Sequence, residues 1–181
     1  MGRMVSPGAI NSEFNQDHIS QGLIRSAAKR VSNNPDEFEQ NLTQLLVIMP
    51  FLQARLARIK PELLAGLASD VETTASRILS LKVDLIPGAD VESILHQRPS
   101  LLLNPEWSKI GACLSGLQTH YSDKDIAAMV SKEPLLLVED VEKILRELER
   151  FVPAPIDLSA ALRANPELAS QVIGLRDLSL W

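Results

Sequence analysis

The feature that most constrains this chain is a proline that recurs behind the same polar and apolar pattern. Pro99, Pro134 and Pro166 each follow an aspartate by nine residues and apolar residues by eight, five and four. Successive prolines are 35 and then 32 residues apart. The residues that precede them are Asp90, Val91, Ile94 and Leu95; Asp125, Ile126, Met129 and Val130; and Asp157, Leu158, Ala161 and Leu162.

Each part of this pattern has a physical reason to form a short helix. The aspartate can cap the helix start, because its carboxylate accepts backbone N–H bonds that have no partner in the first turn. The apolar residues fall on one face at helical spacing. Proline ends the helix, since its ring pushes the preceding residue out of the helical region. We therefore predict short helices over residues 90–97, 125–132 and 157–164.

The pattern continues beyond the proline with leucines and a longer helix. Leu102 and Leu137 follow their prolines by three residues, as Leu64 follows Pro61, although Gln53 interrupts the upstream half of that copy. A unit of one short and one longer helix cannot bury its own apolar face, whereas stacked units can, which predicts an α-solenoid. The aligned positions predict a core that includes Leu102, Leu114, Leu137 and Leu148.

The rest of the chain divides into a tail and N-terminal helices. Residues 1–15 have no periodicity and predict a flexible tail, in which Asn11–Phe14 resembles a cloning junction. Residues 16–51 predict N-terminal helices, and residues 52–181 predict the repeat array. The longer helices are predicted at residues 17–31, 35–49, 69–82, 105–120 and 139–151.

Composition and charge favour an all-α fold and argue against two classes of protein. The chain is 45% hydrophobic but only 4% aromatic, which suits packed helices better than β-sheets. No apolar run approaches the ~18–20 residues that span a bilayer, so we predict no membrane span. The net charge is −5, from 18 Lys and Arg against 23 Asp and Glu, whereas duplex-binding domains are usually basic.

The sequence contains no motif of catalytic or cofactor chemistry. Nucleotide-binding glycine loops and the signatures of zinc proteases and serine hydrolases do not occur. His18, His96 and His120 are far apart and lack a second ligand at metal spacing, so we expect surface or capping roles for them. Cys113 lies in an apolar helical segment, where we expect a buried thiol. We therefore predict no enzymatic activity, no metal site and no cofactor.

Four cations near the prolines are the candidates for a nucleic-acid-binding site. Lys60, Arg98, Lys132 and Arg163, which we call the basic stripe, fall one to three residues before successive prolines. Stacked repeats would align these cations along one edge. They would either complement the negative end of each helix dipole or follow the phosphates of a nucleic acid.

The two tryptophans and one acidic segment are further candidates for core, partner-binding and surface positions. Trp107 aligns with core positions of the other copies, so we predict that it is buried. Trp181 ends an apolar tail and is a candidate for capping the array or for binding a partner. The segment VEDVEKILRELER reads as a solvated helix face. Its predicted ion pairs at helical spacing are Glu139–Lys143 and Glu142–Arg146.

The repeat resembles that of the mitochondrial transcription termination factor (mTERF) family, in which proline and leucine-like residues are spaced three, seven and seven. The best copy has Pro134, Leu137, Ile144 and Phe151. The resemblance covers about residues 52–181, and it implies a right-handed α-solenoid whose repeats have two helices and a 3₁₀ turn. Tetratricopeptide-like repeats are the alternative, although they lack the proline. The looser copies are Pro99, Leu102, Ile110 and Leu117, and Pro61, Leu64, Thr74 and Leu81.

Two functions are compatible with these features. The first is a non-enzymatic interaction scaffold that holds a partner protein in a larger complex, which the acidic charge and the short array favour. The second is a nucleic-acid-binding factor in organellar transcription or ribosome function, which the family resemblance and the basic stripe favour. In both cases the resemblance implies a chloroplast or mitochondrial location.

Overall fold

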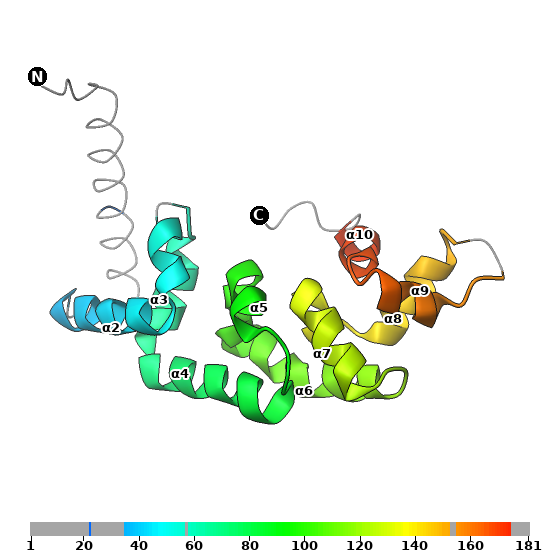
Figure 1. Ribbon diagram of the computed structural model, residues 1–181. Coiled ribbons are helices and arrows are strands. Elements are labelled where there is room, and N and C mark those ends of the chain that lie inside the picture. The colour runs from blue at the N-terminus through cyan, green and yellow to red at the C-terminus, as the bar shows by residue number, and fades with distance from the viewer. Residues whose placement is uncertain (1–21, 23–34, 57, 153–154, 175–181) are drawn as a thin grey trace, which may run out of the picture. The chain divides into compact units, whose positions relative to one another are not determined.

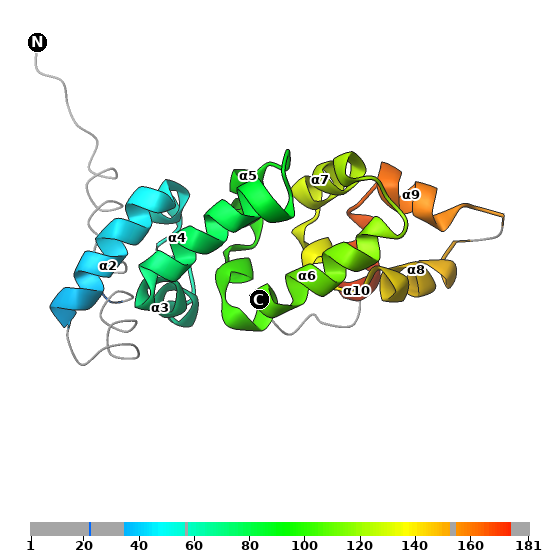
Figure 2. The same ribbon diagram turned by 90° about the horizontal axis from the view of Figure 1, so that it is seen from below.

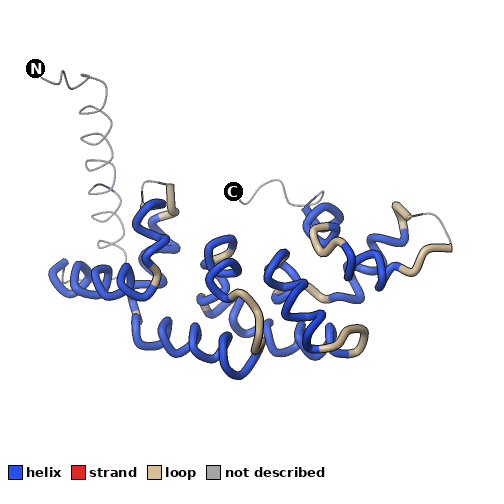
Figure 3. Tube along the Cα trace, viewed as in Figure 1, coloured by secondary structure: helices blue, strands red, loops and turns tan. Residues whose placement is uncertain are grey.

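The described residues are entirely helices and loops. The computed structural model describes residues 22, 35–56, 58–152 and 155–174. No strand occurs in these ranges (Figure 3), which confirms the all-α prediction for them. None of their helices has the length and apolar character needed to cross a bilayer. The predicted tail, His18, Trp181 and the predicted helix 17–31 apart from Gly22 lie outside the described residues.

The contacts divide the chain into two compact units, Met1–Ala75 and Ser76–Trp181. In the first unit α3 packs on α2, which buries Phe38, Leu42 and Leu45. The prediction for residues 35–49 agrees with α2, whereas α3 was not predicted. Pro61 begins α3 at its first position, where the missing N–H of proline costs nothing. The described elements are α2 (Pro35–Ile48), the 3₁₀ turn η1 (Pro50–Arg55), α3 (Pro61–Ser69) and the start of α4 (Val71–Ser80).

The second unit alternates short and longer helices. The short helices α5 and α7 lie side by side, as do the longer helices α6 and α8 (Figures 1 and 2). Helix α10 packs on α8. After α4, the elements are the π turn η2 (Leu81–Leu85), α5 (Val91–Gln97), η3 (Pro99–Leu102), α6 (Asn104–Gln118), α7 (Asp123–Lys132), η4 (Pro134–Leu137), α8 (Val141–Glu149), α9 (Leu158–Ala164) and α10 (Leu168–Gly174).

One backbone geometry recurs at the ends of four helices. The residue before the proline has φ between −127° and −140° and ψ between 70° and 88° in all four cases, at Met49, Arg98, Glu133 and Asn165. These angles lie outside the helical region, which a following proline disfavours for its neighbour. Ile86 before Pro87 has similar angles, φ −137° and ψ 60°, and so does Asp70 at the end of α3, which no proline follows. Pro50, Pro99 and Pro134 then open 3₁₀ turns, and the second residue after each of these prolines is a buried leucine. The earliest described corner is therefore at Pro50 and not at Pro61.

Aspartates cap two of the three predicted short helices. Asp90 accepts the N–H of Ser93 at 2.9 Å, and Asp157 accepts the N–H of Ala160 at 3.0 Å. The prediction for Asp125 is wrong, because α7 begins two residues earlier and Ser122 is its cap. Asp125 instead occupies the first turn, where its carboxylate accepts the Ser122 hydroxyl at 2.9 Å.

The predicted core is confirmed, with two corrections at its edge. Leu102, Leu114, Leu137 and Leu148 are between 0 and 7% exposed. Trp107 is only half-buried, so its predicted place in the core is wrong. Phe151, the last residue of the predicted helix 139–151, is 62% exposed because α8 ends at Glu149.

We expect Leu137→Ala to lower the free energy of unfolding by roughly 2–5 kcal/mol, because it removes a fully buried side chain and leaves a cavity. Urea unfolding followed by circular dichroism measures the change. Leu79→Ala is the matched control, since Leu79 is 62% exposed and its truncation should cost far less. A loss below about 1 kcal/mol for Leu137→Ala would contradict the anchoring role of this leucine.

Candidate functional site

The first cation of the basic stripe in the second unit, Arg98, is bound to a carboxylate. Its Nε and Nη2 donate to Glu106 Oε2 and Oε1 at 3.0 and 2.8 Å. The Ser100 hydroxyl donates to the same carboxylate at 3.1 Å. Arg98 is only 22% exposed, so this bidentate pair is partly shielded from solvent. The guanidinium thus ties the proline corner to the first turn of α6.

The other stripe residues differ in their surroundings. Arg163 Nη1 lies 3.8 Å from Asp125 Oδ2, and its side chain is 55% exposed. Lys132 is exposed and forms no ion pair with the described residues. Lys60 is exposed and belongs to the first unit, whereas the other three belong to the second. Arg98 and Arg163 are therefore already opposed by carboxylates of the same chain.

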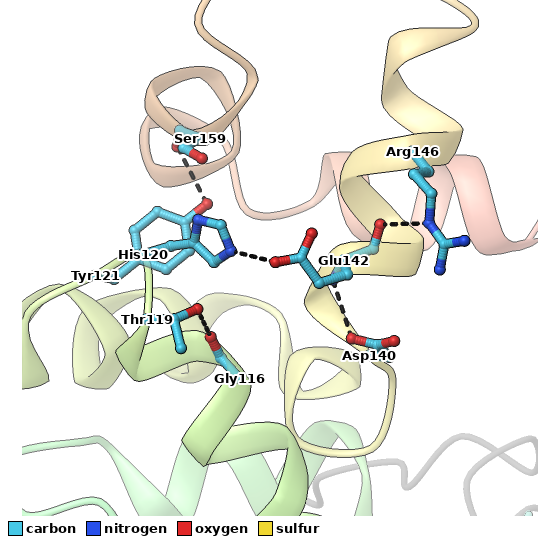
Figure 4. A network of polar contacts seen from close by, with 8 residues as sticks. All are labelled: Gly116, Thr119, His120, Tyr121, Asp140, Glu142, Arg146 and Ser159. Carbon is cyan, nitrogen blue, oxygen red and sulfur yellow. Dashed lines mark hydrogen bonds and ion pairs between the residues drawn. The ribbon is translucent and has the colours of Figure 1, made fainter.

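A polar network joins the end of α6 to α8 and α9 (Figure 4). His120 Nε2 lies 2.7 Å from Glu142 Oε1 in the first turn of α8. The hydroxyl of the adjacent Tyr121 donates to the Ser159 carbonyl oxygen of α9 at 3.2 Å. Asp140 caps α8 by accepting the Glu142 N–H at 3.0 Å. Two neighbouring side chains thus connect one helical pair to the next.

The network corrects one predicted ion pair and confirms another. Glu139 and Lys143 form their predicted pair at 2.8 Å. The carboxylate of Glu142 instead pairs with His120, and Arg146 Nε donates to the Glu142 carbonyl oxygen at 3.2 Å. A separation of 22 residues has no helical periodicity, so the sequence carried no signal for the contact between His120 and Glu142.

The contacts of His120 and Tyr121 hold helices together. Among the described residues, no serine or threonine hydroxyl is hydrogen-bonded to His120 as a nucleophile would be. Ser159 contributes its backbone carbonyl oxygen, and the Thr119 hydroxyl donates to the Gly116 carbonyl oxygen at 2.7 Å. Neither hydroxyl contacts His120. The described ranges also contain no group of three or more His, Cys, Asp or Glu side chains that could hold a metal ion.

A second contact that the sequence did not predict involves Trp107. The guanidinium of Arg77 in α4 lies 5.1 Å from the centre of the Trp107 ring, within the range of a cation–π contact. Arg77 Nη1 also donates to the Leu102 carbonyl oxygen at 2.5 Å, and Nη2 donates to Asn104 Oδ1. Arg77 therefore covers one face of the half-buried Trp107 ring.

Cys113 has the environment of a structural thiol. It is buried, as predicted, on the inner face of α6. Burial raises the pKa of the Cys113 thiol, and the negative charges of Asp140 and Glu139 raise it further. A raised pKa leaves little thiolate at neutral pH, and the thiolate is the reactive form.

Cys113 is the chain's single cysteine, so thiol labelling reports on it alone. We expect an aromatic disulfide reagent to react slowly with the native protein and rapidly in urea, because unfolding exposes the thiol and restores its pKa. Cys113→Ser combined with Ser115→Cys is the control, since it moves the thiol to an exposed position of the same helix. Equal native labelling rates for the two proteins would contradict the burial of Cys113.

Tyr121 is the chain's single tyrosine, so tyrosinate absorbance isolates its hydroxyl. Burial raises the pKa of Tyr121, and Asp157 raises it further. We expect a native titration midpoint above the ordinary value of about 10, returning to that value in urea. The folded state holds the proton more tightly, so this contribution to stability is complete below pH ~10 and is lost at higher pH.

Tyr121→Phe is the control for this titration, because it keeps the ring and removes the ionisable group. It should lose about 0.5–1.5 kcal/mol at neutral pH with the hydrogen bond to Ser159. The alkaline loss of stability caused by Tyr121 should be absent from the variant. A native midpoint at or below about 10 would show that the hydroxyl is not held as described.

The chain was compared with protein-family models, with curated proteins and with solved structures, and no match was found in any of the three. Its function must therefore be inferred from the contacts, charges and exposed side chains described above.

Proposed function

We propose that this chain is a non-enzymatic helical-repeat module that holds a partner protein within a larger assembly. The observation that carries the proposal is the contrast between its charged and apolar side chains. In the second unit Arg98 and Arg163 face carboxylates of the same chain, whereas four large apolar side chains remain exposed. These are Leu79, Val83, Phe151 and Ile156, which are between 50 and 64% exposed.

Exposed apolar side chains of this size favour a protein partner over a nucleic acid. A protein interface buries apolar anchors and derives much of its binding energy from them. A nucleic-acid interface depends on cations that are free to replace the counterions of phosphates. The chain's net charge of −5 adds long-range repulsion between it and any polyanion.

The architecture that we propose for this role is a right-handed α-solenoid of mTERF-like repeats, acting in a chloroplast or mitochondrion. Its support is the resemblance around the prolines, together with the 3₁₀ turns η3 and η4 that separate a short helix from a longer one. A solenoid presents an extended surface on which one partner can contact several repeats.

The alternative function is a nucleic-acid-binding factor in organellar transcription or in a ribosome. Lys132 favours it, because this lysine is exposed and has no ion pair among the described residues. Arg163 adds a second accessible cation, since its contact with Asp125 is long at 3.8 Å. Neighbouring proteins of an assembly could supply the further cations that such a site needs.

Affinity purification of the full chain from organelles, with and without nuclease, separates the two functions. The scaffold proposal predicts a protein partner, present in near-stoichiometric amount, that remains after nuclease treatment. Leu79→Ser combined with Val83→Ser should weaken its recovery, whereas Arg58→Gln combined with Lys109→Gln, at two exposed positions outside η2, should not. Loss of all partners on nuclease treatment would contradict the scaffold proposal.

For the isolated chain we expect duplex DNA binding no tighter than about 10⁻⁴–10⁻⁶ M at physiological salt, the usual range for non-specific contacts. Fluorescence anisotropy with random duplex and single-stranded probes across a salt series measures it. We expect few cations of the chain to contact the phosphates of the probe, so the dependence of affinity on salt concentration should be shallow.

The matched variants for this measurement are Lys132→Gln with Arg163→Gln, and Lys82→Gln with Lys109→Gln as the control. Both pairs remove two positive charges, and only the first belongs to the basic stripe. Nanomolar affinity with steep salt dependence, lost in the first variant and kept in the second, would make the chain a nucleic-acid binder. Neutralising Lys60 and Arg98 as well extends the test to the whole stripe.

A further inference from the structure

A small hollow opens in the second unit where η2, α6 and α7 meet. Ile86, Leu114 and Ile126 form its apolar wall, and all three are buried. Asp84, Gln118 and Asp123 form its polar rim, and all three are exposed. The cavity volume is about 120 Å³. Sites for small organic ligands are typically about 300–1,000 Å³, so this hollow suits a single side chain.

The π turn η2 places one side of the hollow. Its wide turn is closed by the Ile86 N–H, which donates to the Leu81 carbonyl oxygen at 3.0 Å. Such turns are rare and less stable than α-helix, and they are frequent at functional sites. Val83 of η2 is one of the exposed apolar side chains, and Leu79, another, lies four residues before it near the end of α4. An uncommon backbone feature, a hollow and exposed apolar residues therefore occur together.

The rim of the hollow is negatively charged. Asp84 accepts the Ser80 hydroxyl at 3.1 Å, and Asp123 accepts the Gln118 side-chain amide at 3.2 Å. Neither carboxylate forms an ion pair with a residue in the described ranges. Lys82 and Lys124 are exposed on the same two elements, and they too form no ion pair within those ranges. Both carboxylates thus remain available to a cation from outside the chain.

We propose that this hollow is a docking site for a lysine or arginine side chain on a basic helical segment of a partner protein. The alkyl stem of that side chain would lie against Ile86, Leu114 and Ile126, and its cationic head would reach Asp84 and Asp123. Apolar residues of the same segment would cover Leu79 and Val83. The proposal rests on the proposed scaffold function and specifies the chemistry of the partner.

The direct test is a titration of the full chain, followed by amide NMR, with an amphipathic peptide of leucine and lysine at helical spacing. A matched peptide of leucine and glutamate controls for apolar contact alone. We expect saturable shifts of the amides of Ile86, Leu114 and Ile126 with the lysine peptide only. Asp84→Asn combined with Asp123→Asn should weaken binding about tenfold or more. Glu149→Gln combined with Glu167→Gln should leave the affinity unchanged.

Gln118→Trp provides an independent variant, because it places a bulky side chain at the mouth from an exposed position and should block the peptide. Shifts that map elsewhere, equal binding of the two peptides, or unchanged affinity in Asp84→Asn/Asp123→Asn would overturn the proposed site. If a co-purified partner still binds the Asp84→Asn/Asp123→Asn variant, the proposed docking site is wrong and the scaffold function is unaffected. Absence of any protein partner overturns the scaffold function, while the peptide titration still decides whether the hollow binds a cation.

Discussion

The steric clash between a proline ring and the residue before it is the constraint on which the described fold depends. Met49, Arg98, Glu133 and Asn165 all take the same non-helical conformation, although they are apolar, basic, acidic and amide residues. A following proline excludes the helical conformation at each of these four residues, whatever their side chain. Asp70 ends α3 with similar angles, φ −147° and ψ 86°, although valine follows it, so proline is one of two ways in which helices of this chain end. Each clash ends a helix at a defined residue, and in three cases the following 3₁₀ turn directs a leucine into the core. The apolar faces then pack because the corners place them next to one another.

The charged residues near the corners serve these turns in different ways. Arg98 reaches across η3 to Glu106 at the start of α6, so that an ion pair closes the corner. Glu133 occupies the equivalent position and accepts the Leu135 N–H at 3.2 Å, which caps η4 without a cation. Partly buried charges of this kind are costly to leave unpaired. A cation that closes a corner is accordingly a poor ligand for a phosphate, so the alternative proposal of nucleic-acid binding depends on the other residues of the basic stripe.

The sequence predicts those parts of the fold that depend on local chemistry. Asp90 and Asp157 can be predicted as caps from the sequence, because the contact needs only a short side chain and the backbone N–H three residues later. Pro61 is ambiguous in the sequence, because proline is compatible with both a helix end and a first helical position, and in the structure it opens α3. The sequence does not predict that the residues after α6 contact α8 and α9. The contacts of His120 and Tyr121 join residues that are 22 and 38 positions apart, which no local pattern reveals. The end of α8 at Glu149, which leaves Phe151 exposed, likewise falls two residues before the predicted end at residue 151.

Backbone Cα chemical shifts of the residues around each proline measure where the helices end. We expect helical shifts through Gln97, Lys132 and Ala164 and a single non-helical residue at Arg98, Glu133 and Asn165. Leu101 and Leu136 should show slow amide exchange, since their 3₁₀ turns are held in the core. Continuous helical shifts across Arg98 and Glu133, or random-coil shifts on both sides of the prolines, would contradict the claim that proline corners organise this fold.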